Sequence, residues 1–346
     1  MIEIDGSVHS GSGTLLRCSA ALATLLGEPL HLVRIRARRD KPGLRPQHLQ
    51  AIRACRELCG GELEGDHVGS REITYRPGPL IDGGARQWDI GTAGSATMLA
   101  FCALPLGVFA LKPSSFRIRG GLFQDNAPSL FHMRHVLLPT LERMGVRASL
   151  RMIRPGYVPQ GQGELILEVS PRQGPLDPLS AREQGRALRV RGISLASHLK
   201  AEGVSRRMAE EARRLLASAG LSAVVDILED DLAVQKGAAL ALWMDTETRC
   251  RLGSDQAGKR GRRSEGIAAH VVRALIEDYE TGATVDRFLA DQLIPFAALA
   301  KGRSEYVVPR MTDHLDSNLW LVEKMLGARA KWEGNLLRID GIGYHR

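Results

Sequence analysis

Two turns in the sequence combine glycine and serine residues in a way that suits the binding of phosphate. They lie at residues 5–17 (DGSVHSGSGTLLR) and 90–99 (IGTAGSATML), each between a strand-like and a helix-like stretch. Gly11 and Gly13 let the backbone approach an anion, and the first amides of a helix donate hydrogen bonds to it. A single turn of this kind is more often only a turn. Because the two occupy equivalent places in a repeated pattern, we expect two anion-binding helix ends on one face.

The positive charge is concentrated in two short segments. The chain of 346 residues has 47 Lys and Arg against 39 Asp and Glu, which is a formal charge of +8. Residues 34–45 and 249–263 each hold six cations and one Asp, so each carries +5 and the remainder carries −2. Most basic runs are solvated faces. The first run, however, follows a strand-like stretch and precedes a helix that opens at Pro46. Its cations therefore lie at the end of a strand, where ligands tend to bind.

Two further segments carry polar side chains at turns. His314 lies in DHLDSN (313–318), just before an apolar helix, where an imidazole could act as a nucleophile or a base, although a lone histidine is usually structural. The loop RPGYVPQGQG (154–163) carries Arg154 and a tyrosine, and a plain connection between strands explains it equally well. No histidine and cysteine pair has zinc spacing, so we expect no structural zinc.

Hydrophobic periodicity predicts the elements that position these segments. The order strand, helix, strand, helix, strand, strand occurs twice and recurs in part, which indicates a repeated βαβαββ unit. The first copy is predicted at 1–5, 13–26, 30–37, 46–59, 62–68 and 71–76, and the second at 87–90, 94–110, 115–119, 129–144, 146–153 and 163–169. The third has a helix at 284–300, a strand at 304–308, a helix at 315–326 and strands at 328–332 and 335–339, without a first strand in the expected place.

A segment of different layout precedes the third copy. It is predicted to hold a strand at 187–195, a helix at 204–219, strands at 221–228 and 238–244, and a helix at 264–279. We therefore expect an α/β (α+β) fold with one large discontinuous domain, 1–182 and 282–346, and a smaller α/β domain, 183–281, inserted between the second and third units.

Composition agrees with a folded soluble protein. Hydrophobic residues make up 44% and charged residues 25%, which excludes disordered, collagen-like and coiled-coil chains. The five cysteines are an odd number without a disulfide pattern, and we expect them to be reduced. No apolar stretch is long enough to span a membrane and the N-terminus lacks a signal peptide, so we expect a cytoplasmic protein with no membrane partner.

Six segments together resemble the RNA 3′-terminal phosphate cyclase family over nearly the whole chain. They occur in the order that the family has them. The segments are the Asp5-Gly6 start with its glycine turn and Arg17, KPGL (41–44) with QHL (47–49), GTAGSA (91–96), GYVPQGQG (156–163), LADQL (289–293) and HLDSN (314–318).

This resemblance implies three βαβαββ units with one insert, and an enzyme that uses ATP and a divalent metal, Mg or Mn, to turn an RNA 3′-phosphate into a 2′,3′-cyclic phosphate. It implies that His314 is the nucleophile that takes AMP from ATP and passes it to the RNA 3′ end. Further residues that it implies for ATP are Gly11, Gly13 and Arg17, with Phe288, Leu289, Ala290, Asp291 and Gln292 along the adenosine. Those that it implies for the triphosphate or the RNA end are Arg36, Arg39, Lys41, His48 and Arg154.

The chain departs from the family pattern at several positions. Ser10, next to His9, stands where the family has a glutamate associated with the metal, so the metal ligands are left unassigned. Phe101 stands in place of a nucleotide-contacting glutamine, residues 120–128 differ from the usual pattern, and the loop reads GQG where GGG is commoner. These differences indicate a divergent member.

Three alternatives stay open at this point. The first is a non-catalytic relative that acts in RNA binding or ribosome assembly. Another is adenylylation of a different RNA or DNA phosphate end, and the last is an enolpyruvyl transferase, which shares the βαβαββ unit. For the second basic run, 249–263, we expect an exposed position on the insert and a role in guiding RNA. The sequence does not indicate an oligomeric state.

Overall fold

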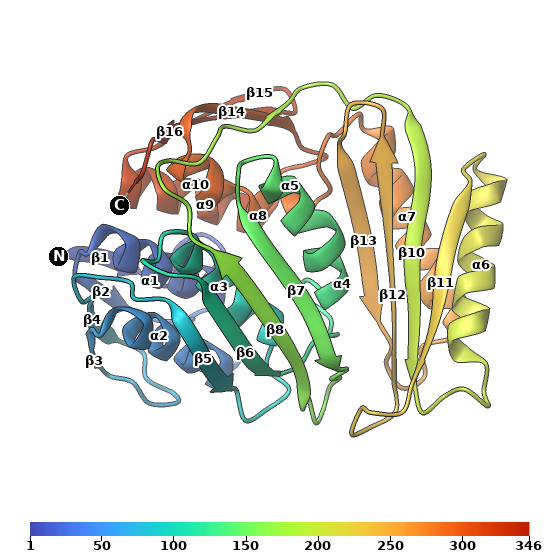
Figure 1. Ribbon diagram of the computed structural model, residues 1–346, viewed down its shortest axis with the longest axis horizontal. Coiled ribbons are helices and arrows are strands. Elements are labelled where there is room, and N and C mark those ends of the chain that lie inside the picture. The colour runs from blue at the N-terminus through green and yellow to red at the C-terminus, as the bar shows by residue number, and fades with distance from the viewer. Residues whose placement is uncertain (346) are drawn as a thin grey trace.

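Four sheets of four strands each organise the computed structural model, which describes residues 1–345 (Figure 1). Three of these sheets share one strand order, first, second, fourth, third, with the first two strands parallel and the other neighbours antiparallel. The first sheet contains β1 (Ile2–Asp5), β2 (Leu30–Val33), β4 (Ile73–Arg76) and β3 (Glu62–Glu64). The second contains β5 (Gly84–Asp89), β6 (Ser114–Gly120), β8 (Gly163–Ser170) and β7 (Arg147–Arg154).

The third sheet contains a strand that the hydrophobic pattern did not locate. It consists of β9 (Ser180–Ala181), β14 (Lys301–Val307), β16 (Leu336–Ile342) and β15 (Arg329–Glu333). The two-residue β9 pairs in parallel with β14 and precedes the different segment in the chain. That segment therefore interrupts the third unit after its first strand, and does not lie between the second and third units as we expected.

Helices fill the space between the three sheets. The first unit supplies α1 (Gly13–Leu26) and α2 (Pro46–Cys59), and the second supplies α3 (Ala96–Val108) and a second helical stretch, α4 (Leu130–His132), η1 (Met133–Leu137) and α5 (Leu138–Glu142). The third supplies α8 (Leu289–Gln292), α9 (Ile294–Leu299) and α10 (Asp313–Leu326). Because α1 is rich in Ala and Leu and is buried on almost every side, it contacts α2, α3 and α10 and forms the centre of the core.

The inserted segment forms its own sheet with two helices. Its strands are β11 (Ala223–Asp230), β10 (Ala187–Ser197), β12 (Gly237–Thr246) and β13 (Arg251–Ala257), and its helices are α6 (Val204–Ser218) and α7 (Ser264–Glu280). The β12 and β13 side of this sheet lies next to α4 in Figure 1. There the rings of Trp243 and His135 stack with centroids 4.2 Å apart, so the insert is packed closely onto the second unit.

The second basic run is not the single exposed segment that we predicted. Cys250 is buried, and residues 251–257 form β13, in which Leu252, Gly253 and Ser254 are buried. A strand is hard to recognise in a run of cations, and the exposed cations of this run are Arg249, Lys259, Arg260 and Arg263. No helix among the described residues is both long and apolar enough to cross a bilayer. The five cysteines are free thiols and are buried.

Candidate active site

His314 lies in the first turn of α10, beside the first glycine turn. Thr312 caps this helix by accepting a hydrogen bond from the backbone N–H of Leu315. The Nδ1 atom of His314 lies 3.3 Å from Oγ1 of Thr14, the second residue of α1. A second link is the hydrogen bond that the Ser10 amide donates to Oγ of Ser317, at 3.1 Å. The N-termini of α1 and α10, 300 residues apart in the chain, therefore meet.

Gly13 is the point where two predicted basic side chains approach the helix start. A Cβ atom at this position would lie 2.1 Å from Nε2 of His48 and 2.9 Å from Nη1 of Arg17, so only glycine fits. His48 is buried, and its Nδ1 accepts a hydrogen bond from the backbone N–H of Arg45 at the start of α2. Gly13, Arg17 and His48 thus form one cluster beside Thr14 and His314.

Arg17 is a buried cation that forms no ion pair with any described residue. Its exposed fraction is 7%, and among the described residues its Nε and Nη1 atoms have no hydrogen-bond partner. Burial lowers the pKa of its guanidinium, yet an arginine stays charged in proteins. A buried charge is costly unless it is paired, so the position of Arg17 favours an anion that is bound during function.

The positive charges at this site act on both histidines. Burial, followed by the charges of Arg17, Arg36 and Arg45, holds the pKa of His48 well below its ordinary value. The pKa of His314 is also lowered, first by the atoms packed around its ring and then by the charges of Arg17 and Arg39. Both imidazoles are therefore neutral near pH 7, and a neutral imidazole has a free lone pair.

The first basic run forms an irregular loop over the first glycine turn. Its Arg38 and Arg39 donate long hydrogen bonds to the carbonyls of His9 and Ser10, at 3.4 and 3.5 Å. Arg36 folds back onto its own loop by donating to the carbonyls of Lys41 and Gly43. Arg39 and Lys41 are exposed and form no ion pair with any described residue, so the loop presents their charges next to the turn.

The second glycine turn joins the same region through Gln47. Oε1 of Gln47 accepts a hydrogen bond from the amide of Ser95, the N-cap of α3, at 2.7 Å. On its other side, a Cβ atom at Gly161 would lie 2.6 Å from Cα of Ala93. Arg154 is held near this loop by donating to the carbonyl of Gln162 at 2.8 Å. Among the described residues Arg154 forms no hydrogen bond or ion pair with the cluster of Gly13, Arg17 and His48 or with His314.

The segment before α9 places unsatisfied acceptors next to α10. Nδ2 of Asn318 donates to the carbonyl of Asp291 at 3.0 Å. The side-chain oxygens of Gln292 and Asn318 are buried and have no hydrogen-bond partner among the described residues. Burial and the charge of Asp286 raise the pKa of Asp291 to about 7. Leu289 and Ala290 are buried, whereas Phe288 is 44% exposed.

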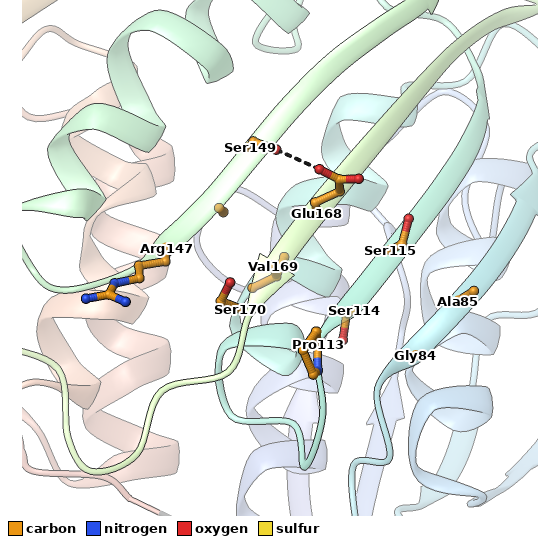
Figure 2. Close-up of a pocket in the computed structure, with 11 residues that line it drawn as sticks. Gly84, Ala85, Pro113, Ser114, Ser115, Arg147, Ser149, Glu168, Val169 and Ser170 are labelled. Carbon is orange, nitrogen blue, oxygen red and sulfur yellow. Dashed lines mark hydrogen bonds between the residues drawn. The ribbon is translucent and has the colours of Figure 1, made fainter.

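A hollow lies on the second sheet, beside the start of β6 and the end of β8 (Figure 2). It measures about 440 Å³ and surrounds Ser114, Ser115 and Ser170. Ser114 begins β6, while Gly120 at the other end of that strand contacts the second glycine turn. The hollow contains none of the predicted site residues, and we assign it no role in the chemistry.

Comparison with known proteins agrees with this geometry. The profile of the family described as RNA 3′-terminal phosphate cyclase matches residues 8–332. The RNA 3′-terminal phosphate cyclase of Pyrococcus furiosus is 38% identical over 327 residues, which is 94% of this chain and 94% of that protein. Those of Desulfurococcus amylolyticus and Methylococcus capsulatus are each 36% identical, over 99% of this chain and over 99% and 97% of their own lengths.

The chain belongs to the RNA 3′-terminal phosphate cyclase family. This confirms the predicted family, and the chain is an enzyme of that cyclase family. Among solved structures, the enolpyruvyl transferase NikO of Streptomyces tendae matches with 14% identity and a TM-score of 0.27, over 98% of this chain and 51% of that one. A likeness at that level carries no argument.

The first glycine turn offers few ligands for a divalent metal. Ser10 provides only a hydroxyl, and the nearby carboxylate of Asp316 is engaged by Nδ1 of His9 at 2.6 Å. No group of three or more His, Cys, Asp or Glu side chains that could hold a metal ion occurs within residues 1–345. The protein residues at this turn therefore do not fit a protein-held metal, and we derive no step through one.

Sequence reasoning missed several residues of the cyclase site. Thr14 and Gln47 lie inside recognised segments, but only the folded chain shows their contacts with His314 and with Ser95. Outside the site, the buried pair of His132 and Asp286 also gave no signal, because 154 residues separate the two in the chain.

Proposed function

We propose that the chain uses ATP to convert a 3′-phosphate on RNA into a 2′,3′-cyclic phosphate through a covalent bond between His314 and AMP. The observation that carries this proposal is the juxtaposition of Arg17, which is buried and has no ion pair among the described residues, with the imidazole of His314 where the N-termini of α1 and α10 meet. An unpaired cation needs an anion, and an unprotonated imidazole is a competent nucleophile. Both properties suit attack on a polyphosphate.

In the first step, the nucleophilic atom is Nε2 of His314. In the tautomer with the proton on Nδ1, this atom donates to Oγ1 of Thr14 and the lone pair lies on Nε2. This atom attacks the α-phosphorus of ATP, so that a P–N bond forms and the bond to the pyrophosphate oxygen breaks. Arg17, the exposed cations of the 34–45 loop and the free amides at the start of α1 would stabilise the charge on the phosphates.

In the second and third steps, AMP moves to the RNA and then leaves it. An oxygen of the RNA 3′-phosphate attacks the phosphorus of the adenylate, and the P–N bond breaks to return His314 with its lone pair. The neighbouring 2′-hydroxyl then attacks the 3′-phosphorus and loses its proton, while AMP departs. Arg39 and Lys41, exposed beside the first turn, are suited to hold the RNA phosphate because they are not used in ion pairs among the described residues.

The unsatisfied oxygens near α8 support a nucleoside subsite at the 288–292 segment. The side-chain oxygens of Gln292 and Asn318 each need a donor, and the amino group of adenine and the ribose hydroxyls are donors. The proposal therefore assigns the adenosine to this segment and the triphosphate to the cluster of Gly13, Arg17 and His48.

Incubation with ATP labelled at the α-phosphorus tests the proposal. Wild-type protein should retain the label after denaturation, in an acid-labile bond typical of a phosphoramidate, and His314→Asn should not. With a 3′-phosphorylated RNA added, the product should carry a terminal phosphate that phosphatase cannot remove.

A matched control is His67→Asn, which removes an exposed imidazole in a loop outside the site and should leave labelling unchanged. Absence of label from the wild type as well would indicate a binding relative. Equal label on wild type and His314→Asn would show that another residue carries the adenylate.

A further inference from the structure

A large cleft separates the insert from the second unit. Its volume is about 900 Å³, at the upper end of the range of about 300–1,000 Å³ typical of small-molecule pockets. One wall consists of Phe123, Asp125 and Tyr157 with the adjacent loops of the second unit. The other includes the start of β12, the basic loop 258–263 and the first residues of α6 and α7 of the insert. None of the residues predicted for ATP or the RNA end lines this cleft.

Positive charge dominates the cleft. Its described lining includes two carboxylates, those of Asp125 and Glu265, against six cations. The six cations are Arg207, Lys236, Lys259, Arg260, Arg262 and Arg263.

Lys259 and Arg260 are exposed and form no ion pair with any described residue, whereas Arg262 is committed to a structural contact. Both terminal nitrogens of Arg262 donate to Asp125 at 3.0 Å. Arg263 has only a distant carboxylate, Glu265, at 3.7 Å. The cleft thus keeps cations that are free to bind a polyanion.

The two walls are joined by direct hydrogen bonds. Besides the pair of Arg262 and Asp125, the side chain of Gln235 donates to the carbonyl of Val158 at 2.8 Å and accepts from the amide of Gln160 at 3.0 Å. The insert is therefore held against the loop 154–163, and the cleft is a preformed feature of the fold.

The same loops that line the cleft pack against the candidate active site. Gly121, two residues before Phe123, donates its amide to the carbonyl of Gly94 in the second glycine turn at 2.7 Å. In the loop 154–163, Val158 lines the cleft while Gly161 packs against Ala93 in that same turn. An RNA strand that extends from the second glycine turn therefore needs to cross only these two loops to reach the cleft.

We propose that this cleft binds the RNA strand upstream of its 3′-phosphate, with Lys259 and Arg260 contacting the backbone. This inference rests on the proposed function and names the part of the substrate that the insert holds. Single-stranded nucleic acid binds to grooves that combine fixed positive charge with apolar surface, and the cleft provides both. An acidic protein partner would also suit the charge, but continuity with the second glycine turn favours the strand whose end reacts there.

Equilibrium binding to 3′-phosphorylated RNAs, measured without ATP over a series of salt concentrations, tests this inference. We would compare an RNA of about 12 nucleotides, within the range of site sizes of about 4–16 nucleotides, with a 3′-phosphorylated dinucleotide. The double variant Lys259→Ala/Arg260→Ala should bind the longer RNA more weakly. Loss of two phosphate contacts should lower the slope of log K against log salt by about 1.4. Its binding of the dinucleotide and its labelling by ATP should stay at wild-type levels.

The matched control removes two exposed cations from the third sheet, Lys301→Ala/Arg329→Ala, and should keep the wild-type affinity and slope. Unchanged binding of the longer RNA by Lys259→Ala/Arg260→Ala would overturn the inference. So would displacement of that RNA by polyglutamate as effectively as by unlabelled RNA, since this would indicate an acidic protein. Failure of the proposed function gives a different result, the absence of label on His314, which this binding assay does not measure.

Discussion

Arg17 destabilises the folded protein when no ligand is bound. Its guanidinium is buried, and two of its nitrogens have no partner among the described residues. Methionine has a similar length and needs no hydrogen bond, so Arg17→Met should raise the free energy of unfolding by about 1–3 kcal/mol. The same change should lower the rate of His314 labelling about 100-fold, because a fixed donor for the phosphates is lost. Urea unfolding without ATP and the α-label assay measure the two effects.

Arg53→Met is the matched control for this change. Arg53 lies on α2 and donates to both a side-chain and a backbone oxygen of Asp66, at 3.0 and 2.7 Å. Its replacement should lower stability and leave labelling unchanged. If Arg17→Met is instead destabilising, the guanidinium has a partner in the free protein and the argument for a bound anion fails.

The charges around His314 make a prediction about pH. Its imidazole must be unprotonated to attack, and its pKa is lowered, so labelling should fall to half only below pH 6.5. Arg39 lowers this pKa and Asp313 raises it. Arg39→Ala should therefore move the acid limb to higher pH, and Asp313→Asn should move it to lower pH. Single-turnover labelling at saturating ATP, without RNA, measures the acid limb of each variant. Movement of the acid limbs of both variants in the same direction would show that another group titrates.

At the scale of elements, one buried carboxylate ties three parts of the chain together. Asp286, before α8, accepts hydrogen bonds from the amides of Phe288 and Leu289, from Gly253 on β13 and from Nε2 of His132 on α4. An asparagine would turn an amino group toward one of these donors. We expect Asp286→Asn to lower the free energy of unfolding by about 3–5 kcal/mol, measured by urea unfolding.

The pH dependence of that loss follows from the two partners. Burial opposes the charge on both, but their mutual attraction lowers the pKa of Asp286 and raises that of His132. The contribution of Asp286 is present above its ordinary pKa of 3.8 and is lost as pH falls through the folded value. That of His132 is present below 6.5 and is lost as pH rises through its raised value.

The difference between wild type and Asp286→Asn should therefore be largest between pH 3.8 and 6.5 and should shrink at higher pH. A difference that grows above pH 6.5 would show that His132 is neutral in the pair. The control Asp177→Asn breaks an exposed pair with Arg172 and should cost less than about 1 kcal/mol at any pH.

Elements with strong local signals were predictable from the sequence. The helices α1 and α2 have the predicted bounds, because left-handed Gly27 and Gly60 end them where the apolar pattern stops. β2 ends at Val33, four residues before the predicted end, since Arg34 and Arg36 take positive φ values of 51° and 54° that a side chain pattern does not reveal.

The other differences arise from tertiary structure. β9 has two residues and exists only because β14 pairs with it. β13 contains Arg251 and Asp255 within a strand whose polar residues are satisfied by neighbours, such as Asp245 for Arg251 at 2.6 Å. The predicted helix at 284–300 is broken into α8 and α9, and the hydrogen bonds to Asp286 hold the backbone before α8. The strand that pairs with β9 is more than 100 residues away in the chain, and the contacts within β13 and before α8 form only once the backbone is folded.

The predicted site residues follow the same division. The glycine turns and His314 could be found because each lies at the start of a helix that the sequence marks, and the sequence shows which residue types stand there. Their convergence, through Thr14 and Gln47, depends on how three units pack around α1, which no local pattern contains. The Gly13 position, where only glycine leaves room for His48, is likewise a property of the assembled core.

For the whole molecule, the close packing of the insert predicts a single unfolding transition. Trp243 stacks on His135, Arg251 donates to the carbonyl of His135 at 2.9 Å, and Asp255 accepts from the amide of Ser129 at 3.0 Å. These contacts are buried or partly buried, so the insert should lose structure together with the second unit. Trp243 fluorescence, isolated by subtracting the signal of Trp243→Phe, should change at the same urea concentration as the far-ultraviolet circular dichroism. Two separate midpoints would contradict this.

The position of β9 also sets an order for synthesis on the ribosome. Ser180 is made 125 residues before its partner Glu305. At about 5–20 residues per second, β9 waits about 6–25 s for the strand that pairs with it. The first two units can close their sheets as they emerge, whereas the faces of α1 and α3 that α9 and α10 cover stay open until translation is nearly complete. A ribosome that pauses within the insert therefore holds a chain whose future core is still exposed to chaperones and proteases.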